Sequence, residues 1–187
     1  MLRYLYFSLI TFVFFGMTAF AAHPLEKSPI KDKIEWLTLE EAFARNQKSP
    51  RKILIDVYTG WCGWCKVMDK KTFTNPEVVK YVNETYYAVK LNAEGKEPIT
   101  VGETKYKYDD QRRSHEAAIA LLQGKMSYPT IVYLDESFNM IQPISGYMEA
   151  PKFHQVITFL GGDYHKKQPF DQYVASTYKQ VYKGVSL

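Results

Sequence analysis

The amino-acid sequence predicts an α/β fold, in which strand-like and helix-like segments alternate along one globular domain. The chain has 187 residues, of which 46% are hydrophobic and 24% charged, a composition typical of a domain with a proper core. The near-continuous apolar run Arg51–Tyr58 indicates a strand, and Lys66–Lys71 just beyond it indicates a helix. Two later apolar runs, 86–91 and 130–134, indicate further strands of the same sheet.

The first 21 residues have the pattern of a secretory signal peptide. Arg3 is followed by an apolar run, and Ala19-Phe20-Ala21 supplies the small-x-small pattern at which such peptides are cleaved. We therefore expect cleavage near Ala21, a polar leader over 22–33, and a mature protein that is periplasmic or secreted. The alternative is an uncleaved anchor, although the run barely reaches the roughly 20 residues of a spanning helix. Membrane contact is expected only through this segment, if it stays uncleaved.

The charge pattern excludes one class of partner. The formal net charge is +4, and the basic residues are scattered along the chain. Neither a nucleic-acid-binding face nor a membrane-binding stripe follows from such a pattern. We expect no nucleic-acid partner and no cofactor.

Two helices are predicted from their start signals in the first half of the chain. Residues 38–41 form a capping box, which starts a helix that extends through Gln47. Asn75 and Pro76, as N-cap and first helical residue, begin a second short helix that extends to Asn83.

The second half is predicted to contain an insertion, two strands and three helices. Residues 93–113 do not fit a minimal fold, and we expect a loop or short hairpin, either a solvated excursion or a rim that selects partners. Ser114 is expected to cap a helix over 115–123, with His115 on the protein surface. The other expected elements are strands over 130–134 and 140–145, a helix over 151–160, and an amphipathic helix in the tail 163–187. This last helix would pack on the domain or, as the alternative, bind a partner.

Cys62 and Cys65 are the only cysteines, and two residues separate them at the corner between the predicted strand and helix. A structural disulfide is disfavoured, because a cross-link over so short a loop removes little chain entropy. A zinc site is also disfavoured, since it needs four ligands and the four histidines show no paired metal-ligand spacing. The spacing and the strand–helix context indicate a reversible redox pair, with no metal bound.

Helix geometry assigns a different task to each of these residues. Cys62 lies at the helix start, where free backbone N–H groups and the helix dipole would stabilise a thiolate, so we expect an exposed nucleophile. Cys65, one turn on, would be the more buried, resolving thiol that attacks the mixed disulfide formed at Cys62. Asp56 lies within the apolar run; buried beneath the pair, it would have a raised pKa and relay protons for Cys65. The alternative for Asp56 is a strand edge that faces water.

Residues 53–56 followed by Trp61–Lys66 resemble the active-site region of the thioredoxin superfamily, in which an acid lies six residues before the first cysteine. Further along, 86–92 is similar to the family's next core strand with its lysine, and 127–134 to its cis-proline loop and strand. The resemblance implies a thioredoxin-like domain over 34–162, with a central mixed sheet flanked by helices.

The resemblance also implies which residues bind substrate around the cysteines. Pro129 would be cis and lie against the pair, which leaves the Tyr128 backbone free to pair with an extended polypeptide segment. Trp61 and Trp64 would form an apolar rim with Gly63 between them, although buried packing is the alternative for Trp61. Lys90 would contact Asp56 in this arrangement, but an ordinary surface lysine is the simpler interpretation.

The segment Lys66–Val78 is closer to thioredoxin-like proteins of the bacterial cell envelope than to ordinary thioredoxin, including the thioredoxin-like domain of the membrane disulfide reductase. This similarity favours a reducing role on protein disulfide or dithiol substrates, with an upstream redox partner such as a membrane disulfide reductase. The sequence thus predicts a thiol-disulfide oxidoreductase. Two alternatives stay open: a redox-inert partner-binding domain on the same fold, and a carrier that binds a soft metal ion through the two thiolates.

Overall fold

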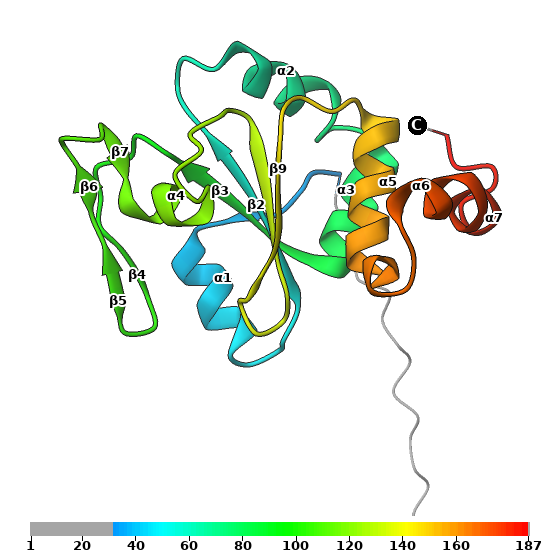
Figure 1. Cartoon of the computed structure of the whole chain (residues 1–187), viewed down its shortest axis with the longest axis horizontal. Coiled ribbons are helices and arrows are strands. Elements are labelled where there is room, and N and C mark those ends of the chain that lie inside the picture. The colour runs from blue at the N-terminus through cyan, green and yellow to red at the C-terminus, as the bar shows by residue number, and fades with distance from the viewer. Residues whose placement is uncertain (1–31, 187) are drawn as a thin grey trace, which may run out of the picture.

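The computed structural model describes residues 32–186, so the expected signal peptide and most of the leader lie outside the described residues. A five-stranded mixed sheet forms the centre of the protein, in the order β1-β3-β2-β8-β9 (Figure 1). Strand β2 is central, parallel to β3 and antiparallel to β8, while β1 and β9 form the two edges. The strands are β1 (Trp36–Leu37), β2 (Lys52–Tyr58), β3 (Tyr86–Asn92), β8 (Thr130–Leu134) and β9 (Met140–Ser145).

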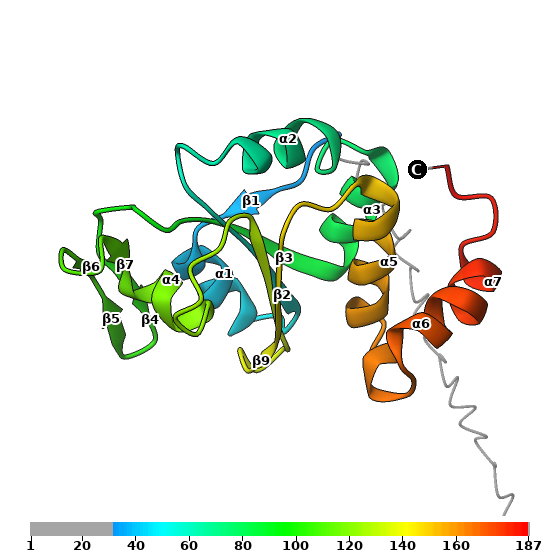
Figure 2. The same ribbon diagram turned by 45° about the horizontal axis from the view of Figure 1, so that its top comes forward.

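Helices cover both faces of this sheet, as the two views in Figures 1 and 2 show. One face packs against α1 (Leu39–Asn46) and α4 (Glu116–Leu121). The other packs against α2 (Gly63–Lys71), α3 (Pro76–Thr85) and α5 (Ala150–Gly161). A strand covered on both faces has apolar residues throughout, which is why β2 shows a continuous apolar run in the sequence.

The alternation of side chains along β2 decides which residues face α2, the helix that begins at the cysteine pair. Ile53, Ile55 and Val57 belong to the core beneath α1 and α4, whereas Leu54 belongs to the core beneath α2, α3 and α5. Lys52 and Asp56 lie at two-residue steps from Leu54, so both charges fall on its face of the sheet. Both side chains are buried.

The predicted helix starts are confirmed by hydrogen bonds. The Glu41 amide donates to Thr38 Oγ1, and the Thr38 amide donates to Glu41 Oε2, which completes the capping box of α1. Asn75 Oδ1 accepts from the amides of Glu77 and Val78 at the start of α3, with Pro76 as its first residue. Helix α3 continues to Thr85, two residues beyond the predicted end.

Residues 93–115 form two small antiparallel pairs beside α4, at the end of the protein away from α5 (Figure 1). Strand β4 (Ile99–Val101) pairs with β5 (Thr104–Tyr106), and β6 (Tyr108–Asp109) pairs with β7 (Ser114–His115). The expectation of a surface His115 is wrong, because this side chain is fully buried. Its Nδ1 accepts a hydrogen bond from the Ala117 amide, so His115 rather than Ser114 caps α4.

The C-terminal segment is helical but irregular, and it packs against the outer side of α5 (Figures 1 and 2). A π-helical turn, Tyr173–Tyr178, lies between two short α-helical pieces, so the expected C-terminal helix is formed from consecutive short segments. Tyr173 is fully buried and its hydroxyl donates to Thr158 Oγ1 of α5. The tail elements are a 3₁₀ turn (Tyr164–Lys166), α6 (Phe170–Gln172), the π-helical turn and α7 (Lys179–Val181). Within residues 32–186, no helix has the length and apolar character needed to cross a bilayer.

Candidate active site

The cysteine pair lies where β2 ends and α2 begins. The Cys62 amide donates to the Thr59 carbonyl, 3.2 Å away, which closes the turn after the strand. Cys62 is the N-cap of α2, and Cys65 lies in its first turn. The two Sγ atoms are joined in a disulfide with a Cα–Cα distance of 5.3 Å, so the pair is oxidised in this structure. A three-residue separation on a helix start therefore suffices to bring the sulfurs within bonding distance.

Backbone geometry, rather than exposure, distinguishes the two sulfurs. The Cys65 amide donates to Cys62 Sγ at 3.1 Å, and the positive end of the α2 dipole adds to this interaction. Both features stabilise a thiolate on Cys62 once the disulfide is reduced. The exposed fractions are 4% for Cys62 and 3% for Cys65, so the expected exposed nucleophile and more buried partner are not seen in the oxidised pair.

Asp56 is buried, with 1% of its surface exposed, and the strand-edge alternative is wrong. Burial raises the pKa of its carboxyl, and this effect outweighs the lowering by the cation of Lys90. Oδ2 accepts a hydrogen bond from Lys90 Nζ at 2.6 Å, while Oδ1 has no hydrogen-bond partner among residues 32–186. The acid thus holds a proton at a higher pH than an exposed aspartate does.

Lys90 is not the surface lysine that the sequence favoured. Its ammonium lies 4.9 Å from the ring centre of Trp36 and 5.1 Å from that of Tyr58. It also donates to Asp69 of α2, so a single cation joins β2, β3 and the active-site helix. Burial opposes the charge of Lys90, but the carboxylates of Asp56 and Asp69 together raise its pKa. Nothing in the sequence around Asp69 distinguished it from other helix-surface acids.

Two exposed tryptophans flank the disulfide. Trp61 is 68% exposed and Trp64 61% exposed, so buried packing of Trp61 is excluded. The Trp61 ring contacts Tyr128 edge to face at 5.9 Å between centroids, and Trp64 lies 5.2 Å from Tyr147. The Tyr128–Pro129 peptide bond is cis, as the resemblance implied.

Gly63, between the cysteines, has open space around it. An added Cβ at this position would meet no atom within 4 Å. Gly63 and the two tryptophans on either side of it in sequence are therefore open to solvent, whereas the cysteine side chains themselves are buried.

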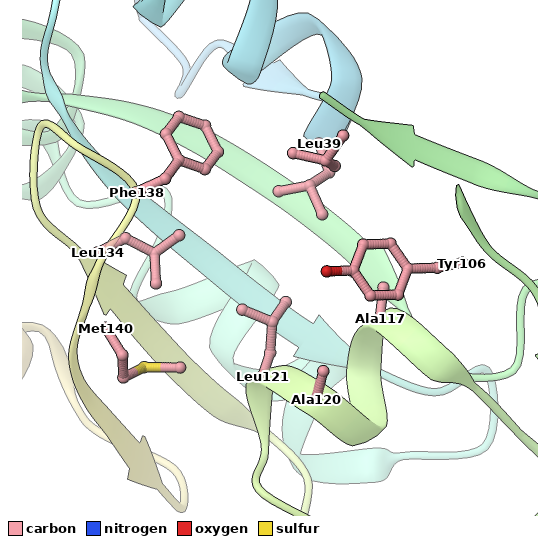
Figure 3. A pocket seen from close by; sticks show the side chains of 9 residues that line it. Leu39, Tyr106, Ala117, Ala120, Leu121, Leu134, Phe138 and Met140 are labelled. Carbon is pink, nitrogen blue, oxygen red and sulfur yellow. The ribbon is translucent and has the colours of Figure 1, made fainter. Parts of the chain in front are cut away.

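A separate cavity of about 290 Å³ lies on the opposite face of the sheet, between α1 and α4 (Figure 3). Tyr106 of β5 points its hydroxyl into it, and the other labelled side chains are apolar. Neither Asp56 nor the two cysteines line this cavity. Among residues 32–186, no group of three or more potential metal ligands is brought together.

Residues 19–183 match the family model Thioredox_DsbH, described as "Protein of unknown function, DUF255". The thiol:disulfide interchange protein DsbD of Cronobacter sakazakii (strain ATCC BAA-894) is 30% identical over 119 residues. This match covers 62% of the chain but only 17% of the relative, so the chain spans a small part of that protein's length.

Two solved structures are similar in fold. A thioredoxin-fold protein from Helicobacter pylori gives a TM-score of 0.51 at 19% identity, over 77% of this chain and 96% of that one. A DsbH oxidoreductase gives 0.50 at 15% identity, over 73% and 91% of the two chains. The predicted thioredoxin-like fold, a mixed sheet flanked by helices with an added C-terminal helical segment, is therefore confirmed.

Proposed function

The chain belongs to the Thioredox_DsbH family, and from that membership we propose an extracytoplasmic thiol-disulfide oxidoreductase that reduces or exchanges protein disulfides. The fold, the cysteine pair and the relatives are those of thiol redox proteins in general. The observation that carries the specific proposal is the Cys62–Cys65 disulfide at the start of α2, with a buried acid of raised pKa on the strand that leads into it.

In the proposed reaction, the Cys62 thiolate attacks one sulfur of a substrate disulfide. The substrate S–S bond breaks, a mixed disulfide forms at Cys62, and the departing substrate thiolate takes up a proton. Cys65 then loses its proton, with Asp56 as acceptor, and attacks Cys62 Sγ. The substrate leaves as a dithiol and the Cys62–Cys65 disulfide forms, so two electrons have passed from enzyme to substrate.

The substrate surface in this proposal consists of Trp61, Gly63, Trp64, Tyr128 and Pro129. Support comes from the exposure of both tryptophans and from the open space over Gly63. An extended polypeptide would pair with the Tyr128 backbone, a mode of recognition that tolerates many sequences.

An upstream thiol donor must return the pair to its reduced form after each turnover. We infer a membrane disulfide reductase in this role, because part of the chain is similar to the thiol:disulfide interchange protein DsbD. The signal-like pattern of residues 1–21 and the oxidised pair favour a periplasmic or secreted location. Cell fractionation, with the mass of the recovered N-terminus, tests this location; full-length protein confined to the cytoplasm contradicts it.

The reaction is tested with single-cysteine variants, which each carry one thiol because the chain has no other cysteine. We expect Cys62→Ser to abolish catalysed reduction of a protein disulfide such as that of insulin. Cys65→Ser should instead accumulate a mixed disulfide with the substrate, visible as a covalent adduct by mass spectrometry. Undiminished turnover by Cys62→Ser would rule out the reaction. Partner binding that survives the loss of both cysteines, with no catalysed reduction by the wild-type protein, would favour a redox-inert binding domain.

A further inference from the structure

A carboxylate lies at the edge of the aromatic surface beside Cys62. Trp61 Nε1 donates a hydrogen bond to Glu94 Oε1 at 3.0 Å, and the same indole contacts the Tyr128 ring edge to face. The negative charge of Glu94 also contributes, after burial, to the raised pKa of the Tyr128 hydroxyl. Both observations place the carboxylate close to the two rings. We call Trp61, Glu94 and Tyr128 the acidic aromatic corner.

The backbone fixes Glu94 in this position. Its amide donates to Asn92 Oδ1 at 3.0 Å, and the preceding Ala93 amide donates to the Tyr58 carbonyl at 2.8 Å. Tyr58 is the last residue of β2, so the segment that carries Glu94 is bonded to the strand that leads into the cysteines. The corner is therefore held by the sheet rather than by a free loop.

The charge of Glu94 is not neutralised within the described chain. Among residues 32–186, no lysine, arginine or histidine forms an ion pair with it. The nearest lysine in sequence, Lys96, instead pairs with Asp110 and lies over the ring of Tyr108. An indole N–H is a neutral donor, so the bond from Trp61 orients the carboxylate without cancelling its charge.

We infer that the acidic aromatic corner binds an arginine or lysine side chain that neighbours the cysteine of the substrate polypeptide. A cation placed over an exposed aromatic face is attracted by the ring, and a carboxylate at the ring edge adds a charge-assisted hydrogen bond. The inference rests on the proposed function, and it narrows the substrate class to polypeptides with basic residues beside their disulfides.

The test compares two short peptides that each contain one disulfide and differ only in having arginine or glutamine beside the attacked cysteine. Reduced full-length protein should reduce the arginine peptide about fivefold faster in kcat/KM, and the ratio should fall towards one in 0.5 M salt. Glu94→Gln should lose this preference, and Trp61→Phe should lose part of it because the ring remains without its N–H donor.

Glu97→Gln is the matched control, since it removes the same charge from an exposed side chain three residues away. It should keep the full preference for arginine. Equal rates of the wild-type protein on both peptides, or equal loss of preference in Glu94→Gln and Glu97→Gln, would overturn the inference and leave the oxidoreductase proposal standing. Failure of the wild-type protein to reduce either peptide would overturn both.

Discussion

Strand β2 carries a buried ionisable side chain near each end of one face. The surroundings favour ionisation at one end and oppose it at the other. At the end away from the cysteines, Lys52 is 5% exposed and bonds to Glu136 at 2.7 Å and Asp163 at 3.2 Å. Burial works against this cation, but the two carboxylates outweigh burial and raise the pKa of Lys52. Bonds from Lys166 and Lys52 likewise outweigh burial at Asp163 and lower its pKa, so ionisation is favoured at this end.

At the end that leads to the cysteines, the balance is reversed. Burial of Asp56 outweighs its bond to Lys90, so the pKa of its carboxyl is raised, and one of its oxygens lacks a hydrogen-bond partner among the described residues. Replacing such a group by a neutral side chain would increase the free energy of unfolding, because a buried, incompletely paired carboxyl destabilises the folded state. In our proposal, the Lys52 end stabilises the sheet, whereas burial of Asp56 costs stability and supplies a carboxyl with a raised pKa for proton transfer.

The largest expected effect comes from Asp56→Asn, which removes the proton acceptor but keeps the shape. We expect decay of the mixed disulfide at Cys62 to slow about 100-fold at pH 7. Stability to urea should be equal or higher. A raised acid pKa means that the native state binds the extra proton, so wild-type stability falls as pH rises from about 4 through the folded pKa of Asp56. The variant should lack this fall, and an unchanged decay rate would contradict the proposed role.

Lys52→Met should affect stability and not the reaction. The variant keeps most of the side-chain volume but leaves Glu136 and Asp163 without their shared cation. Their side chains are 43% and 36% exposed and stay hydrated, so the cost should be about 2 kcal/mol, below that of a fully buried pair. The midpoint temperature of thermal unfolding should fall by about 6 °C. Because the pKa of Lys52 is raised, the stability that its charge contributes is fully present below about pH 10 and is lost as the pH rises through the folded pKa. If Lys52→Met unfolded at the wild-type temperature but reduced disulfides more slowly, the proposed difference between the two ends of β2 would be contradicted.

Substitutions of Lys90 and Asp69, the two charged neighbours of Asp56, should have smaller effects. They should shift the pKa of Asp56 in opposite directions. Lys90→Gln removes the cation that opposes burial, so the pKa of Asp56 should rise and the acidic limb of the pH–rate profile should move up by about one pH unit. Asp69→Asn removes a negative neighbour that raises the pKa of Asp56, so the limb should move slightly down. Shifts of the same sign in both variants would contradict this account.

Most helices and strands could be predicted because their start residues and apolar patterns lie within the element itself. Strand β2 has an apolar run, α1 a capping box and α3 an Asn-Pro start. Strands β8 and β9 were predicted with the boundaries that the structure has. Strand β1 has only two residues, too few for an alternating pattern, and its pairing with β3 comes from the tertiary fold.

The sequence predicted the proposed reacting residues and, as one of two interpretations, the contact of Lys90 with Asp56, but not the contact of Lys90 with Asp69. The spacing of Cys62, Cys65 and Asp56 was visible, whereas the bridge from Lys90 to Asp69 joins residues 21 positions apart that meet only once the sheet has formed. The sequence places His115 on the surface, because a histidine in a first helical turn is usually solvated. Pairing of β7 with β6 instead draws its imidazole inward, where it replaces a serine cap.

All three tryptophans of the chain belong to the redox end of the molecule. Trp61 and Trp64 flank the disulfide, and Trp36 lies beneath the Lys90 ammonium. The Lys52 end contains none. The tryptophan fluorescence of the unlabelled protein, excited selectively over its 15 tyrosines, therefore arises at the end that carries the cysteines. Its change between oxidised and reduced samples offers a signal of the state of the cysteines without an added dye.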